Sequence, residues 1–373
     1  MCRPARTFGL ALALSIWLSL PPRVATYVSG SPTPQCRFSP LPSGTMQPSG
    51  WQRTQLLMQL DQLGSALPLF YAPVNRSRWV VADGEPSVDG TCVTASHGKP
   101  KHCGVDGHGG LHETFVYWLN GAAPLASILR VHRPAFFAKV REVVHGLLGK
   151  YCDPSHRRTP SRWLQAFDDQ VPARHSTWSM FRLATALTQW AENNVEDGPQ
   201  VTLCVNKYLL ELAAHLEPTG GLTASMGWSY YRWHEALSIV VWSASSPTPA
   251  VDASTARVIA GLGHTLISTG FDWAAWLSNG TNVMYNRSHP DPSHPNSLST
   301  HGVNVGAALQ APVWKFRTTG NVTDLNAIET MVANVMKYHG QANGMCVSPH
   351  TRSPPPLSPF RCHSPVASAP YCF

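Results

Sequence analysis

Apolar residues recur every three or four positions along most of the chain, and this spacing predicts amphipathic helices. Helices are expected from Trp51 onward and over residues 116–131, 136–151, 178–193, 201–217, 233–244, 254–269, 303–318 and 324–339. Two of the clearest apolar stripes are Phe137, Val140, Val144, Leu147 and Cys204, Tyr208, Leu212. Strand patterns are sparse, so the predicted fold class is mainly α.

Further stripes set the expected inward faces of the first and last helices. They comprise Leu56, Leu60, Leu63, Leu67 at the start, Val305, Ala308, Leu309, Phe316 in residues 303–318, and Leu325, Ile328, Val332, Val335 in residues 324–339. Consecutive helices are joined by short segments rich in Gly and Pro, as antiparallel neighbours require. Repeated hairpins in one large domain favour a toroid of inner and outer helices over an open solenoid.

The two ends of the chain differ in composition from this helical domain, which is expected over residues 51–345. Arg3 and Arg6 precede an apolar run from Phe8 to Leu20, which predicts a secretory signal peptide over residues 1–30. The run is short for a membrane span, and an uncleaved anchor is the weaker alternative. Residues 31–50 form a Pro/Ser-rich leader, and residues 346–373 form a Pro-rich tail expected to be disordered.

A secreted, extracellular glycoprotein with no stable membrane span after signal removal is therefore expected. The N-glycosylation candidates are Asn75, Asn279, Asn286 and Asn321. Eight cysteines follow the signal region, where an oxidising compartment permits disulfides, and Cys92 with Cys103 is the best guess for one bridge. The net charge of +7 comes from scattered Lys and Arg, so nucleic acid is not expected as a partner.

Signatures of common catalytic sites are absent from the sequence: there is no G-x-S-x-G elbow, Walker loop, H-E-x-x-H or dinucleotide-binding fingerprint. Cys103, His108 and His112 match no closed tetrahedral spacing, and a loop with a disulfide is preferred to a metal site. No metal is therefore assigned to this chain.

Clusters of aromatic and polar residues at helix starts are the candidate binding sites. Thirteen tryptophans raise the expectation of a ligand-lined site, because Trp offers a flat platform for sugars. The substrate-binding candidates are Tyr117, Trp118, Arg232, His234, Glu235, His301 and Asn304. Two purely structural alternatives stay open. Tyr117 and Trp118 could anchor a helix in the core, and Glu235 could stabilise a helix N-terminus through the helix dipole.

The stretch from Thr300 to Met345 carries the most specific pattern. His301 and Asn304 stand at a helix start, and His339, Gln341 and Asn343 follow the next helix. Lone histidines are usually structural, but two His-Gly pairs at the same ends of one hairpin indicate a site.

Five segments resemble the secreted β-L-arabinofuranosidase-like proteins of glycoside hydrolase family 127 and its relatives. They are SGWQRTQLLMQLDQL, SRWVVADGE, TFVYWLNGAAPLASIL, STHGVNVGAALQAPVWKFRTTGN and KYHGQANGM, in order between about residues 50 and 345. The resemblance implies an (α/α)6 toroid-type barrel and retaining hydrolysis of terminal arabinofuranosyl linkages in plant or cell-wall type glycans. It also implies a Cys thiolate nucleophile on a zinc ion and a Glu acid/base.

This chain departs from the family pattern after Met345. The family's zinc ligands and acid/base lie beyond that point, whereas residues 346–373 contain no Asp or Glu, and Cys346, Cys362 and Cys372 sit among Pro and Ser. About nine predicted helices also fall short of the twelve of a full barrel, so the barrel is expected to be incomplete.

Three functions stay open on these grounds: a truncated, inactive glycoside hydrolase-like protein, a non-catalytic carbohydrate-binding relative, or a structural protein without a ligand.

Overall fold

The computed structural model describes residues 41, 44–81, 112–153, 177–245, 251–283 and 298–340. Within these residues the chain is mainly helical and forms no β-strand, as predicted. The Cys92–Cys103 bridge, Asn286, the Gln341–Asn343 part of the last motif, and most of the predicted signal, leader and tail lie outside the described residues. No helix in these ranges combines the length and apolarity needed to cross a bilayer.

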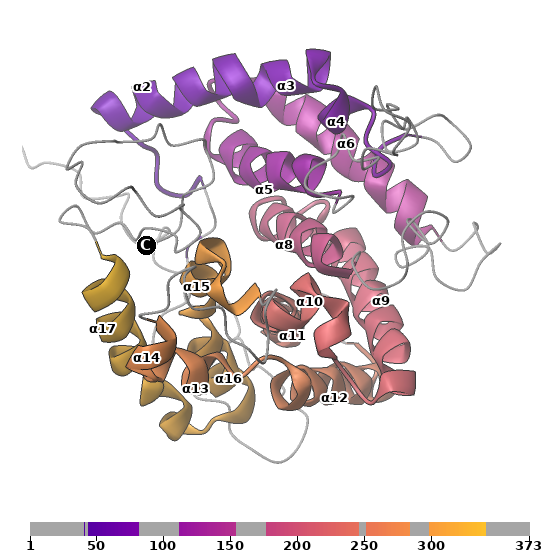
Figure 1. The fold of residues 1–373 in the computed structure, drawn as a ribbon. Coiled ribbons are helices and arrows are strands. Elements are labelled where there is room, and N and C mark those ends of the chain that lie inside the picture. Colours follow the sequence, from indigo (N-terminus) through magenta and orange to yellow (C-terminus); the bar gives the residue numbers. More distant parts are fainter. Residues whose placement is uncertain are drawn as a thin grey trace, which may run out of the picture.

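The helices follow one another around an arc (Figure 1). They are α2 Gly50–Gln59, α3 Ser65–Phe70, α4 Ala72–Asn75, α5 Glu113–Ile128, α6 Pro134–Cys152, α8 Thr177–Asn193, α9 Gly198–Leu216, α10 Trp228–Tyr231, α11 Trp233–Ser245, α12 Ala253–Thr269, α13 Trp273–Ser278, α14 Gly280–Val283, α15 Gly302–Ala308, α16 Ala311–Thr319 and α17 Ala327–His339. Seven of these begin and end within three residues of their predicted ranges: α5, α6, α8, α9, α11, α12 and α17.

Two layers of helices make up the central part of the arc. Helices α5, α8 and α11 contact one another in that order, and α6, α9 and α12 form a second series of neighbours. Each of α5, α8 and α11 also packs on the helix that follows it in sequence, so the predicted hairpins α5–α6, α8–α9 and α11–α12 are confirmed.

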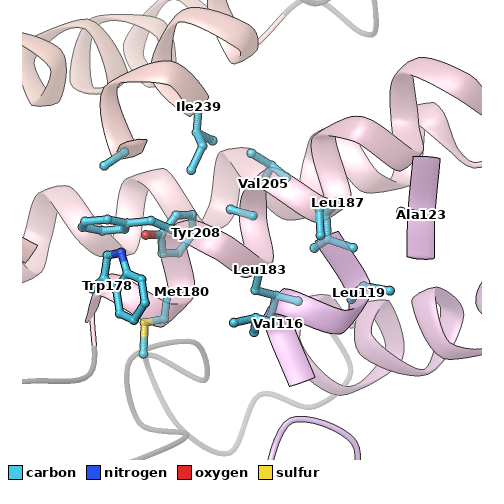
Figure 2. Close-up of a cluster of buried hydrophobic side chains, with 14 of the residues drawn as sticks. Val116, Leu119, Ala123, Trp178, Met180, Leu183, Leu187, Val205, Tyr208 and Ile239 are labelled. Carbon is cyan, nitrogen blue, oxygen red and sulfur yellow. The ribbon is translucent and has the colours of Figure 1, made fainter. Parts of the chain in front are cut away.

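The core lies between these layers. Figure 2 shows Val116 and Leu119 of α5 meeting Leu183 and Leu187 of α8, with Ile239 of α11 nearby. Both predicted stripes, on α6 and on α9, are buried at every named position. Removal of this apolar surface from water is the main driving force for the arrangement.

The first predicted helix is interrupted, and one inward position there is wrong. Residues Leu60–Gly64 form a π-helical turn, which inserts an extra residue and rotates the following side chains. Leu60 is buried as expected, but Leu63 is 62% exposed.

The predicted helix over residues 303–318 is also broken, into α15 and α16. Pro312 stands near the start of α16, where its missing N–H and its ring favour a new helix rather than a continued one. Helix α17 makes its main described packing against α13, so residues 303–339 do not form one simple hairpin.

A disulfide that the sequence did not single out joins Cys152, at the end of α6, to Cys204 in α9. The two Cα atoms are 5.2 Å apart, and the bond closes a loop across 52 residues of sequence separation. It links neighbouring helices of the same layer.

Candidate functional site

Side chains from the starts of α5, α8, α10, α11 and α15 meet in one arginine–tryptophan cluster. Helices α5, α8, α11 and α15 all lie around the middle of the view in Figure 1. Four members are buried, Trp178, Arg232, Glu235 and Asn304, and we call them the inner residues. Four more are at least partly exposed, Tyr117, Arg182, Trp228 and His301, and we call them the outer residues.

Glu235 is the hub of the inner residues. Its Oε1 accepts a hydrogen bond from Arg182 Nη2 at 2.8 Å and lies 3.5 Å from Arg232 Nη1, while Oε2 accepts from Trp178 Nε1 at 3.0 Å. Burial alone would raise the pKa of Glu235, but the two guanidinium groups and the Trp178 bond hold it below its ordinary value. Glu235 is therefore an ionised carboxylate at neutral pH with both oxygens engaged.

Arg232 ties α15 to this hub. Its Nε donates to Asn304 Oδ1 at 2.6 Å, and Asn304 Nδ2 donates in turn to the Leu298 carbonyl at 2.9 Å. The guanidinium carbon lies 4.5 Å from the ring centre of Trp178 and 5.1 Å from that of Trp228. Charge-assisted bonds and stacking on aromatic rings hold the Arg232 side chain in one orientation.

The outer residues surround this network with rings. The Trp228 and His301 ring centres are 5.0 Å apart, and Tyr117 lies 5.9 Å from Trp178. The Arg182 guanidinium carbon lies 5.8 Å from the centre of the Tyr117 ring. Tyr117 is 40% exposed, so solvent and solutes reach this edge of the cluster.

A tight approach between two helices fixes the start of α11, where Arg232 and Glu235 stand. Gly270 follows α12 and lies against Trp233, where an added Cβ would come within 2.3 Å of the ring. Trp233 Nε1 also donates to the Phe271 carbonyl at 2.9 Å. A side chain at position 270 would displace this contact and shift the cluster.

Trp118 does not belong to the cluster, contrary to the prediction that it faces the same way as Tyr117. The two residues are neighbours on α5 and point in different directions. Trp118 Nε1 donates to the Gly64 carbonyl at 2.9 Å. Pro68 lacks the backbone N–H that would normally bond this carbonyl in a helix, so Trp118 supplies the missing donor.

Two further histidines named in the sequence analysis, His112 and His339, have no described contact with the cluster. His112 is buried in a left-handed backbone conformation, and its carbonyl accepts a hydrogen bond from Trp79 Nε1 at 2.9 Å. His339 Nε2 lies 2.6 Å from the Val283 carbonyl, so that histidine ties α17 to α14. In the described part of the chain, no three His, Cys, Asp or Glu side chains gather as a metal site would require.

His234 lies beside the cluster but is fully buried, and neither ring nitrogen finds a hydrogen-bond partner among the described residues. Burial lowers its pKa from 6.5 to about 4, with the Arg232 and Arg182 charges adding to the effect and Glu235 opposing it. His234 is thus neutral in the folded protein at neutral pH, and it cannot contact a solute directly.

We expect the free energy of unfolding to fall by about 3 kcal/mol between pH 6.5 and pH 4 through His234. In this window the unfolded chain takes up a proton at His234 and the folded chain does not, so acid favours unfolding.

Denaturant melts at several pH values between 4 and 6.5 measure how the free energy of unfolding changes with pH. His234→Leu should flatten it, because an apolar side chain carries no proton. The same change at His264, an exposed histidine of α12, should leave it intact. An unaltered slope in His234→Leu would contradict this account.

Sequence reasoning missed Trp178, Arg182 and Trp228. Arg182 interrupts an otherwise apolar stretch between Phe181 and Leu183, and it stands four residues after Trp178. A charged side chain within a buried helical stretch needs a partner of opposite charge, so Arg182 itself indicated a polar site in the interior.

A groove of about 490 Å³ lies elsewhere, between α9 and α12. Its lining is mostly small and apolar, with Leu210, Ala213, Val258, Gly261 and Leu262 among its residues. Its polar lining side chains are Glu217 and Thr265, fewer than the polar groups that converge at the arginine–tryptophan cluster. The arginine–tryptophan cluster is therefore the better candidate site.

Comparison of the chain with models of protein families finds no match, and neither the curated proteins nor the solved structures provide one.

Three of the four N-glycosylation candidates fall in the described part of the chain. Asn75, Asn279 and Asn321 are all exposed, so an attached glycan would meet no buried surface at these positions.

Proposed function

We propose that this chain is a secreted carbohydrate-binding relative of the β-L-arabinofuranosidases, and that the arginine–tryptophan cluster is its sugar site. The observation that carries the proposal is the combination of partly exposed rings, Tyr117, Trp228 and His301, with a fixed polar network directly behind them. Rings provide flat surfaces for a sugar, and a small number of fixed polar groups provide its orientation.

The arrangement of the cluster agrees with a toroid-type barrel. In this proposal α5, α8 and α11 are inner helices and α6, α9 and α12 are outer helices of an incomplete (α/α)6 barrel. The cluster then lies at the starts of the inner helices. Partial positive charge at these helix N-termini would add to the field of the two arginines.

Binding without hydrolysis fits the state of Glu235. A glycosidase needs a carboxylic acid that donates a proton to the leaving oxygen. The lowered pKa of Glu235 keeps it ionised, and its two hydrogen-bond donors, Arg182 and Trp178, hold it in one orientation, which suits a residue that positions other groups.

Hydrolysis is the second candidate function, favoured by one observation. Glu113 and Glu235 both act electrostatically on Tyr117, so two carboxylates face the same part of the cluster. Purified protein incubated with arabinofuranosides and added zinc tests this candidate. Release of arabinose above a denatured control, abolished by Glu235→Gln in a folded variant, would favour hydrolysis over binding alone.

His301→Ala should weaken sugar binding roughly three- to tenfold, which corresponds to the loss of one aromatic contact. Calorimetric titration of a glycan panel provides the measurement. His339→Ala is the matched control, since His339 is also partly buried but contacts Val283 instead of the cluster. Equal losses in both variants, or no loss in His301→Ala, would show that the sugar binds elsewhere.

A further inference from the structure

An exposed apolar corner lies where α3 ends and α4 begins. Leu69, Phe70 and Tyr71 follow one another there and are 80%, 68% and 40% exposed. None of the three belongs to the hydrophobic core, and neither ring has an aromatic or cationic partner among the described residues. Contact of so much adjacent apolar surface with water is unfavourable, so this corner calls for a group that covers it.

An N-glycosylation candidate stands at the same corner. Helix α4 follows Tyr71 directly and ends at Asn75, whose backbone N–H donates to the Tyr71 carbonyl at 3.1 Å. The two residues are therefore one helical turn apart. The residue before a helix N-cap commonly packs against the fourth helical residue, and in α4 these positions are Phe70 and Asn75. A group attached to the Asn75 side chain can consequently reach both rings.

The side chain of Asn75 is available for such an attachment. It is exposed and makes no hydrogen bond to another described residue. The side chains of Asn279 and Asn321, in contrast, accept hydrogen bonds from the backbone N–H groups of Thr281 and Thr323. The orientation of the Asn75 amide is therefore open to being set by what the amide carries.

We infer that Asn75 carries an N-linked glycan, and that the first N-acetylglucosamine of this glycan packs on Phe70 and Tyr71 and covers the apolar corner. The inference rests on the proposed secretion of the chain and is independent of the proposed sugar site. The apolar face of a pyranose ring fits an aromatic ring, and this contact exists only in the folded state. The glycan should therefore stabilise the fold.

The attachment uses a lipid diphosphate-linked oligosaccharide as the donor. A bond forms between Asn75 Nδ2 and the anomeric carbon of the first sugar, while the bond from that carbon to the diphosphate oxygen breaks. The lipid diphosphate leaves with the electron pair, and the amide loses one proton. Ser77, which completes the Asn-x-Ser signal, is fully buried in the folded chain, so the transfer takes place before this corner folds.

The full chain produced in a cultured eukaryotic secretory cell line tests the inference. Mass spectrometry of the peptide that contains Asn75 should find it glycosylated. In urea melts, Asn75→Gln should have an unfolding equilibrium constant about three- to tenfold larger than that of the wild type. Trimming every glycan to its first sugar with an endoglycosidase should leave this ratio within about twofold of its original value, because only the first sugar reaches the rings.

Variants of the rings separate the packing from any other effect of the glycan. In the double variant Phe70→Ala and Tyr71→Ala, adding Asn75→Gln should change the unfolding equilibrium constant by less than about twofold. Trp51→Ala is the matched control, since Trp51 is a ring 77% exposed at the start of α2 and outside the corner. In that background the full effect of Asn75→Gln should persist. All of these side chains are exposed, so the variants are expected to fold.

The outcomes separate this inference from the secretion on which it rests. An unmodified Asn75 in a secreted chain with another glycosylated asparagine would overturn the inference and leave secretion standing. A glycan on Asn75 whose effect on stability is absent, or is the same with and without the two rings, would also overturn it. A chain retained inside the cell with no asparagine glycosylated would overturn the proposed secretion, and the inference with it.

Discussion

Replacing Glu235 with Gln is expected to lower the free energy of unfolding by about 3–5 kcal/mol, the usual effect of breaking a buried ion pair. The substitution keeps the size of the side chain but removes the charge that compensates Arg182 and Arg232. Arg232 is almost completely buried and would then lie in a medium that solvates it poorly. Urea melts of both proteins at pH 7 measure the difference.

The Glu142→Gln variant is the matched control for this experiment. Glu142 pairs with Lys139 on α6, and both side chains are more than half exposed. Water and salt screen such a pair, so the control should change stability by less than about 1 kcal/mol. Similar losses in the two variants would show that the Glu235 network is no stronger than a surface pair.

Lowering the pH should remove the negative charge of Glu235, as the Glu235→Gln substitution does. Because its folded-state pKa lies below the unfolded value, the carboxylate contributes stability above the ordinary glutamate range. That contribution is lost as the pH falls through the lowered pKa. The loss therefore occurs on the acid side of the ordinary glutamate range.

Removing the disulfide with the double change Cys152→Ser and Cys204→Ser is the second large expected effect, a loss of about 4 kcal/mol. The crosslink spans 52 positions, and its loss restores the conformational freedom of that loop in the unfolded chain. Thermal melts with and without reductant give the measurement. Reductant should lower the melting temperature of the wild type by clearly more than that of the double variant, which lacks this crosslink. If the wild type is unfolded in the presence of reductant and its melting temperature still does not change, the crosslink is contradicted.

The sequence predicted the central hairpins well because their helical period is strong. On α6 and α9, each apolar position that sets the predicted face is buried. It failed where backbone geometry departs from a regular helix. The π-helical turn at Leu60–Gly64 and the restart of the chain at α16 both change the phase of the pattern, and neither change is visible from apolar spacing alone.

The candidate site was partly predictable for a related reason. Arg232, Glu235 and Asn304 stand at helix starts in polar surroundings, and the structure brings them together. Trp118 was assigned wrongly because adjacent aromatic residues on a helix face different neighbours. Its hydrogen-bond partner, the Gly64 carbonyl, is 54 positions away in sequence. Such a distant partner depends on tertiary packing, which no local pattern encodes.

The bond from Arg232 to Asn304 joins positions that are 72 residues apart, and Arg182 lies 53 residues from Glu235. As a growing chain leaves the ribosome, the α8–α9 and α11–α12 hairpins can pair from local contacts well before α15 has been synthesised. During that interval Arg232 has its carboxylate partner but lacks its amide partner. The arginine–tryptophan cluster should consequently be among the last features that the nascent chain completes, after most of its helical layers are already in place.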